Sequence, residues 1–202
     1  MSWSEPAGDD HGDRSAKHRT VFAGPLKPVS DEIREGSLQV FTFKTGLFSR
    51  VAHDLQLRLE GFSLRLDGDE LEGHFRPVSI TVDGVIRRGQ LDSHVLSDRE
   101  HAEILENIRT TILQTSRYPE AVLKGRIVTA ASGWRIDGTL ELKGNPQPLV
   151  ILVRREGRHA RGEVEIVPSR WGITPFRALF GAIQLQDRVK IVFDIPSFAG
   201  LP

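Results

Sequence analysis

The chain has 202 residues, of which 39% are hydrophobic, and this suffices for one domain with one core. Its 27 Lys and Arg residues are matched by 27 Asp and Glu residues, so it lacks the surplus of cations that a row of nucleic-acid phosphates requires. The absence of cysteine excludes disulfides, thiolate nucleophiles, cysteine-ligated zinc and iron–sulfur clusters. No stretch approaches the roughly 18 consecutive apolar residues of a membrane span, so we expect no transmembrane segment. From the balanced charge we also expect no nucleic-acid partner.

The first 35 residues differ in composition from the rest of the chain. Within residues 2–20, Trp3 is the only large apolar residue, which predicts a disordered tail. Pro25 and Pro28 favour an extended arm up to Glu35. No apolar run of about 7–15 residues, as in a secretory signal, occurs before residue 30, and we therefore expect a cytoplasmic protein. The predicted organisation is a flexible tail or arm over residues 1–35 and one domain over residues 36–202.

From residue 36 onward, apolar and polar residues alternate with a period of two, which is typical of strands with two different faces. The clearest strand is Trp134–Lys143. In the segment Leu55–Leu66 the apolar positions change parity at Gly61, which predicts a bulge or a corner. The full set is about eight strands by this criterion; the others are Leu38–Lys44, Val78–Asp83, Ala121–Thr129, Leu149–Arg155, Ala160–Ile166 and Ile183–Ile195.

One segment follows a helical pattern instead. Ser97-Asp98-Arg99-Glu100 has the form of a capping box, and it is followed by apolar residues at helical spacing as far as Tyr118-Pro119, namely Ile104, Leu105, Ile108 and Ile112. Short turns such as Asp67-Gly68-Asp69 make antiparallel neighbours the expectation for the strands. We predict an all-β fold, a closed antiparallel barrel of about eight strands with one α-helix, whose interior is either filled by side chains or holds one ligand.

Candidate catalytic and metal-binding groups are few. His53 and Asp54 are adjacent on a predicted strand, so their side chains point to opposite faces and do not address one substrate atom. Asp92-Ser93-His94 contains the residue types of a hydrolytic triad without a nucleophile-elbow pattern. The histidines His53, His74, His94 and His101 are not at paired metal-ligand spacing, and we assign no catalytic residue, no metal site and no cofactor.

Four motifs in this order resemble the YceI family of polyisoprenoid-binding proteins. They are His53-Asp54 after a glycine-containing turn, the helix end Thr115–Pro119, the strand Gly138–Gly144 followed by Pro148, and Ser169–Ile173. The resemblance spans about residues 36–196 and implies a lipocalin-like antiparallel barrel whose lumen takes an isoprenoid chain, often that of a quinone. Two features depart from the family: the chain lacks the export signal that many members carry, and Gly36-Ser37 stands where a His-Ser pair is common.

The expected function is therefore the non-catalytic binding or carriage of an apolar chain, such as a polyisoprenoid or a prenylated quinone, in transport or stress response. The residues assigned to the ligand are mostly aromatic or aliphatic; they are Phe41, Phe43, Phe48, His53, Leu55, Leu57, Trp171, Phe176 and Phe180. Phe41 and Phe43 are expected to face the lumen, whereas Leu38 and Val40 face a helix or a second layer. A polar head group would need His53, Arg170 or Arg177 at the mouth.

Three alternatives remain open from the sequence. The apolar positions are also compatible with an ordinary packed core. A barrel hydrolase or isomerase would use His53 or His94. A solid barrel would instead serve as a protein-interaction module, and a homodimer is one of the partners left open.

Overall fold

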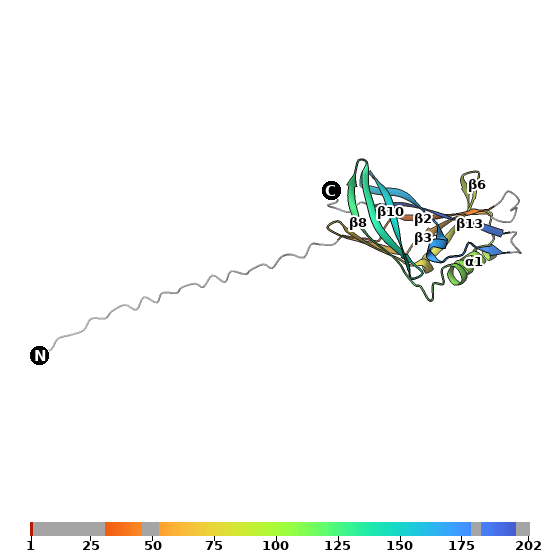
Figure 1. Cartoon of the computed structure of the whole chain (residues 1–202), viewed down its shortest axis with the longest axis horizontal. Coiled ribbons are helices and arrows are strands. Elements are labelled where there is room, and N and C mark those ends of the chain that lie inside the picture. The colour runs from red at the N-terminus through yellow and green to blue at the C-terminus, as the bar shows by residue number, and fades with distance from the viewer. Residues whose placement is uncertain (2–30, 46–52, 179–182, 197–202) are drawn as a thin grey trace.

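The computed structural model describes residues 1, 31–45, 53–178 and 183–196. In this part of the chain the alternating segments form extended strands, and antiparallel pairing joins them into one strongly curved sheet (Figure 1). The thirteen strands are β1 (Asp31–Ile33), β2 (Ser37–Lys44), β3 (Asp54–Leu59), β4 (Phe62–Asp67), β5 (Glu70–Phe75), β6 (Ile80–Arg87), β7 (Gln90–Asp92), β8 (Ala121–Ala130), β9 (Gly133–Leu142), β10 (Asn145–Glu156), β11 (His159–Ile166), β12 (Arg177–Ala178) and β13 (Ile183–Pro196).

The strands follow the order β1-β4-β5-β8-β9-β10-β11-β13-β2-β3-β6-β7, and β12 pairs with β13. Among the described residues no ladder joins the two edge strands, β1 and β7. The sheet is thus a half-barrel rather than the predicted closed barrel of about eight strands, whereas the all-β class, the antiparallel pairing and the α-helix are confirmed. Residues 31–33, which belong to the predicted tail or arm, form an extended strand against β4; residues 2–30 lie outside the described residues.

Gly61 marks the corner that the parity change predicts. On one side of it β3 pairs with β2 and β6, and on the other side β4 pairs with β1 and β5. The Arg76 amide donates to the Gly61 carbonyl at 2.8 Å, and the Gly61 amide donates to Ser79 Oγ at 2.7 Å. A Cβ atom at residue 61 would lie 2.8 Å from Arg76 Nε and 2.9 Å from Ser79 Oγ, which explains the glycine. The corner thus connects β3 and β4, which lie near opposite ends of the strand order.

The predicted strand count is wrong because short strands lack a long alternating run. In β5 the inward positions are Leu71, Gly73 and Phe75, and the glycine interrupts the apolar pattern. A Cβ at Gly73 would come within 2.9 Å of Leu64 Cδ2, so the neighbouring strand occupies that space. The predicted strand at Val78 is also wrong at its start, since residues Pro77–Ser79 form a 3₁₀ turn with Val78 exposed, and β6 begins at Ile80.

Helix α1 (Asp98–Glu106) begins at the predicted capping box. The Glu100 amide donates to Ser97 Oγ at 3.3 Å, and the Ser97 amide donates to Glu100 Oε2 at 2.8 Å. A π-helical segment, η2 (Asn107–Ile112), continues the helix and ends where Lys143 Nζ donates to the Ile112 carbonyl at 3.0 Å. Within the described part of the chain, no helix is long and apolar enough to cross a membrane.

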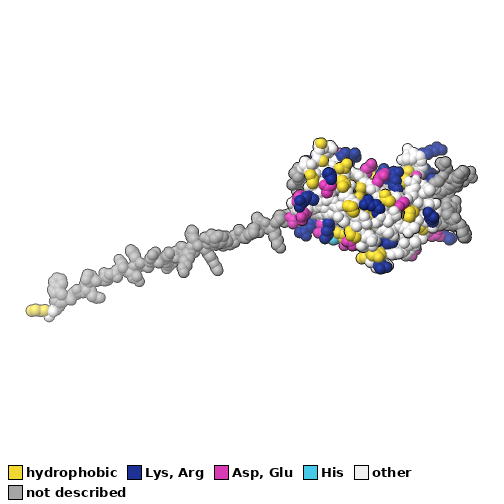
Figure 2. Space-filling model, viewed as in Figure 1, with side chains coloured by type: hydrophobic (Ala, Val, Ile, Leu, Met, Phe, Trp, Pro, Cys, Tyr) yellow, Lys and Arg dark blue, Asp and Glu magenta, His cyan; other side chains and the backbone are white. Residues whose placement is uncertain are grey.

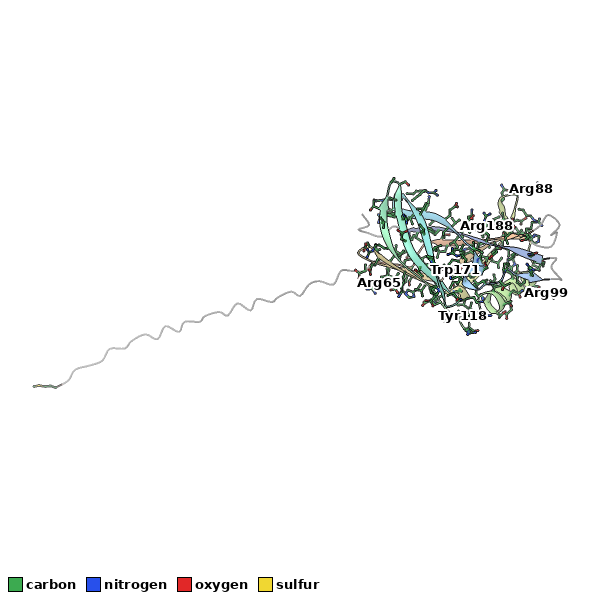
Figure 3. All side chains as sticks on the ribbon, in the orientation of Figure 1. Arg65, Arg88, Arg99, Tyr118, Trp171 and Arg188 are labelled. Atoms are coloured by element: carbon green, nitrogen blue, oxygen red, sulfur yellow. The ribbon has the colours of Figure 1, made fainter. Side chains whose placement is uncertain are left out.

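The main core lies on the concave side of the sheet. Trp134, Ile136 and Leu140 on β9 are buried, as the alternation predicts. Trp171, in the 3₁₀ turn η3 (Pro168–Trp171), is 0% exposed, and its Nε1 donates to the Leu140 carbonyl at 2.8 Å. Figure 3 shows Trp171 inside the molecule, with Arg88 and Arg99 at its periphery. The indole thus fastens the chain after β11 to the wall of the half-barrel.

The outer surface carries charges of both signs. On the face seen in Figure 2, Lys and Arg side chains are interspersed with Asp and Glu side chains and with single apolar groups. Several cross-strand ion pairs belong to this surface, for example Arg161 with Asp194 at 2.7 Å. This face therefore offers no single-sign patch to a polyanion, in keeping with the balanced composition.

Replacing Trp171 with Phe should lower the free energy of unfolding by about 1–3 kcal/mol, because the variant loses one buried hydrogen bond and part of the indole volume. Urea denaturation of the purified protein measures the change. Tyr118→Phe is the control, since Tyr118 lies outside the buried core with Arg117 5.2 Å from its ring. Equal stability of wild type and Trp171→Phe would contradict the anchoring role of the indole.

Candidate functional site

A cavity of about 710 Å³ occupies the concave side of the half-barrel. This volume falls within the range of about 300–1,000 Å³ that small-molecule sites have. The lining comes mainly from inward-facing residues of the strands and from the helical segment α1–η2. Residues that line it include Val40, Leu55, Leu57, Ile104, Ile108, Trp134, Ile151, Ile191 and Phe193. Of the two interiors that the sequence left open, the described residues therefore leave an unfilled space and not a side-chain-filled one.

One end of the cavity is closed and apolar. Trp134, Val153, Ala160 and Ile195 line it there, and each of these side chains is at most 7% exposed. The register explains this closure, because Val153 lies opposite Trp134 and Ala160 lies opposite Ile195 on neighbouring strands. An apolar group at this end would be surrounded by hydrocarbon alone.

The other end, which we call the polar mouth, is lined by His53, Glu100, Glu103, Gln186 and Asp187. Gln186 Nε2 donates to the Lys44 carbonyl at 2.9 Å, which holds the start of β13 against the end of β2. Figure 1 shows α1 toward the same end of the molecule as β12 and the start of β13. Glu100, Glu103 and Gln186 are exposed, so this end faces solvent.

His53 is half-buried in the polar mouth. Burial of the imidazole lowers its pKa below the ordinary value of 6.5, and the nearby cations Arg87 and Lys44 lower the pKa further. The carboxylates of Glu100 and Asp54 act in the opposite direction and are outweighed. The imidazole is consequently neutral at neutral pH, with one nitrogen able to donate and the other able to accept a hydrogen bond.

Thr42 lies inside the mouth, on the inner face of β2. Its cross-strand partners are Val189 on β13 and Leu55 on β3, and all three line the cavity. Thr42 Oγ1 is buried and has no hydrogen-bond partner among the described residues. A buried hydroxyl in this state is a free point of attachment for a polar atom in the cavity.

Four of the predicted ligand residues line the cavity: His53, Leu55, Leu57 and Phe176. Phe48 and Phe180 lie outside the described residues. The predicted place of Trp171 is wrong, because its indole is buried in the wall and does not line the cavity. Whether the four lining residues contact a ligand stays a prediction.

The expected orientation of β2 is wrong. Leu38, Val40 and Thr42 line the cavity, whereas Phe41 and Phe43 do not. The two phenylalanine rings instead lie beneath cations of β13: Arg188 is 4.7 Å from the Phe43 ring, and Lys190 Nζ is 5.4 Å from the Phe41 ring. Long basic side chains with apolar stems cover these rings on the outer face.

The pairing of β2 with its neighbouring strands shows which face of β2 lies inside the half-barrel. Val40 lies opposite Ile191 and Leu57, and Leu38 lies opposite Phe193. Directly opposed residues share a face, so the inward parity of β13 determines that of β2. The sequence-based expectation had placed the two aromatic residues of β2, Phe41 and Phe43, on the inner face.

The remaining polar candidates do not meet in the cavity. Neither Arg170 nor Arg177 is among the lining residues; the Arg170 guanidinium is 5.7 Å from the Trp171 ring. Asp92 and His94 share an exposed turn in which the His94 amide donates to Asp92 Oδ1 at 3.1 Å. Of the two histidines considered for catalysis, only His53 lines the cavity.

Comparison with known proteins identifies one family. The family model of the YceI-like domain matches residues 46–196. No curated protein matches the chain.

Two solved structures share the fold at low sequence identity. BcnA of Burkholderia cenocepacia is 14% identical with a TM-score of 0.55, and the match covers 81% of this chain and 96% of that one. A polyisoprenoid binding domain from Saccharophagus degradans, implicated in plant cell wall breakdown, is 11% identical with a TM-score of 0.53, and the match covers 82% of this chain and 94% of that one.

The lowered pKa of His53 predicts a pH-dependent stability. Because the folded protein takes up this proton at a lower pH than the unfolded chain, the unfolded state binds more protons in that window. The contribution is complete above about pH 6.5 and is lost as the pH falls through the folded-state pKa. Between about pH 7.5 and pH 5, wild type should therefore lose more free energy of unfolding than His53→Gln.

Urea denaturation at each pH measures this difference. His94→Gln, at an exposed turn outside the cavity, controls for the removal of one histidine. If wild type and His53→Gln have the same pH slope, the imidazole is solvated and its pKa is not lowered by burial.

Proposed function

This chain belongs to the YceI-like family, and we propose that its cavity binds one apolar chain of the polyisoprenoid class and carries it without chemical change. The observation that supports this most directly is the nearly continuous hydrocarbon lining of a 710 Å³ cavity. A protein that only needed a core would fill such a space with side chains. The structural neighbour from Saccharophagus degradans, described as a polyisoprenoid binding domain, agrees with the proposal.

The size of the cavity sets an approximate ligand length. If each apolar carbon needs about the 30 Å³ that a water molecule occupies in the liquid, the cavity takes on the order of twenty carbons, or about four prenyl units. At ~0.8 kcal/mol per buried CH₂, one prenyl unit contributes roughly 3–4 kcal/mol before ordering losses. Four units therefore contribute roughly 12–16 kcal/mol, which is enough to offset an association cost of about 4–15 kcal/mol, and a longer chain would extend out of the cavity.

The two unlike ends of the cavity set the direction of the ligand. A tail that ended against Trp134 and Ile195 would bury only hydrocarbon, whereas a polar head there would lose its hydration without a partner. We therefore place the head group, such as the ring of a prenylated quinone, at the polar mouth. Of the predicted ligand residues, His53 lines this mouth.

A catalytic use of His53 is the second candidate, because its imidazole is neutral and faces the cavity. The adjacent Asp54 does not serve as its orienting carboxylate, since Asp54 Oδ1 accepts a hydrogen bond from the Lys44 amide at 2.7 Å. A product that differs from the extracted ligand, formed by wild type and not by His53→Gln, would favour this candidate over carriage.

Filling the cavity should displace the ligand. Leu55→Trp adds an indole to the inner face of β3, so uptake of a prenyl lipid should fall several-fold or more. Phe43→Trp is the matched control, because Phe43 lies on the outer face beneath Arg188. Native mass spectrometry and solvent extraction of both variants measure the bound lipid, and their melting temperatures report the folded state.

The wild-type protein itself is expected to bind the lipid. A prenyl lipid should co-purify with it or bind after addition, and Phe43→Trp should bind like wild type. Equal uptake by Leu55→Trp and Phe43→Trp would place the lipid outside the cavity. No uptake by any folded variant would refute the proposed function.

A further inference from the structure

The hairpin that joins β6 to β7 projects from the half-barrel. Figure 1 shows it, labelled β6, standing out from the sheet at the same end of the molecule as α1 and the start of β13. Arg88 and Gly89 at its tip have φ angles of 53° and 79°, the geometry of a tight type I′ turn. A Cβ atom at Gly89 would meet no atom of the described residues within 4 Å, so the tip stands away from the body.

This hairpin lies beside the polar mouth of the cavity. Ile86 pairs with Asp54, and one residue further along the same register Arg87 comes next to His53, which lines the mouth. After burial, Arg87 contributes most to the lowered pKa of His53, which agrees with this placement. Figure 3 shows Arg88 at the outer end of the projection. A surface that the hairpin touches is therefore brought close to the opening of the cavity.

The tip carries positive charge with little compensation from carboxylates. Arg87 and Arg88 are exposed, and residues 86–91 include no Asp or Glu. Arg88 takes part in no ion pair among the described residues. Arg87 reaches only Asp92, at 4.0 Å, and Asp92 Oδ1 also accepts a hydrogen bond from the His94 amide at 3.1 Å. Because the whole chain has no net charge, the tip is a local excess of two positive charges.

An apolar side chain is exposed beside these arginines. Leu91 is 46% exposed, although Ile86 lies directly opposite it in the hairpin. Two cations are too few for the row of phosphates in a nucleic acid. Cations next to an exposed apolar side chain match instead the surface of a bilayer, where anionic head groups overlie hydrocarbon.

The carboxylates of the mouth belong to other elements. Glu100 accepts from the Ser97 amide at 2.8 Å, and Glu103 pairs with Arg99 at 2.9 Å, both on α1. Asp187 lies on β13. In Figure 1 α1 and the hairpin lie on opposite sides of this end of the molecule. The tip can thus meet an anionic surface while the carboxylates of α1 stay back from it, where salt screens their repulsion.

We propose that the tip of the β6–β7 hairpin, through Arg87, Arg88 and Leu91, docks this protein on the surface of an anionic phospholipid bilayer, with the cavity mouth beside the membrane. The inference goes beyond the proposed function, because it assigns a partner surface and not the occupant of the cavity. Two arginines and one leucine give weak, reversible attachment. Such attachment suits a carrier that loads at a bilayer and then leaves it.

Vesicle binding of the full-length protein tests the docking. Sedimentation compares vesicles of phosphatidylcholine mixed with phosphatidylglycerol against vesicles of phosphatidylcholine alone. At low salt, wild type should bind the mixed vesicles about 20- to 30-fold more tightly, because each arginine near an anionic surface contributes about fivefold. Most of this preference should disappear at about 0.5 M salt, since the Debye length then falls well below 10 Å.

Variants of the tip identify the residues. Arg87→Gln combined with Arg88→Asn removes both charges, and asparagine tolerates the left-handed backbone of residue 88. Affinity for the mixed vesicles should fall about 20- to 30-fold. Leu91→Ser keeps the charges and should bind about 3- to 10-fold more weakly than wild type. The matched control, Arg154→Gln with Arg158→Gln, removes two exposed arginines near the closed end and should bind like wild type.

The outcomes separate this inference from the proposed function. The three tip residues do not line the cavity, so folded tip variants should take up a dissolved prenyl lipid like wild type. Equal binding of mixed and neutral vesicles by wild type, or an equal loss in the closed-end control, would overturn the docking. Leu91→Ser binding like wild type would mark a site for any polyanion and would overturn the membrane assignment. Vesicle binding without any lipid uptake would refute the proposed function alone.

Discussion

The structure depends on the registration of apolar positions between neighbouring strands. Leu38 faces Phe193, Val40 faces Ile191 and Leu57, and Val153 faces Trp134, so that one concave surface collects the apolar side chains of many strands. A slip of one residue in any ladder would turn its apolar set outward. The same registration that holds the sheet together thus builds the cavity wall, and fold and candidate site cannot be altered independently.

The period of two was enough to predict the long strands and the corner at Gly61, and the capping box with helical spacing was enough to predict the helix, because each of these signals is encoded within a few residues. Short strands such as β5 could not be predicted from this alternation, because Gly73 interrupts the apolar run. The glycine is needed there because the Leu64 side chain of the neighbouring strand occupies the space of a Cβ atom. Closure of the barrel was also beyond it. Whether the edges β1 and β7 pair depends on distant parts of the chain, and the described residues show no ladder between them.

The candidate site was predicted less well than the fold because the identity of a lining residue depends on which face is inside. Phe41 and Phe43 are more apolar than their neighbours, but β13 offers Arg188 and Lys190 to cover them on the outer face. Trp171 does not line the cavity for a different reason: its indole N–H donates to the Leu140 carbonyl, which holds the ring in the wall. Thr42 could not be singled out from sequence, since only the structure shows that its hydroxyl is buried and unpartnered.

An unfilled apolar cavity carries a cost that also suggests how the protein responds to its ligand. Lining residues that face empty space forfeit the packing contacts that a filled core would give them. A ligand that binds the folded state alone restores those contacts and raises stability by an amount that grows with its concentration relative to the dissociation constant. The α1 helix contributes to the wall in this way, because Ile104 lines the cavity although none of the α1 residues is fully buried. Contacts that a ligand makes with Ile104 would therefore add to the burial of this helix.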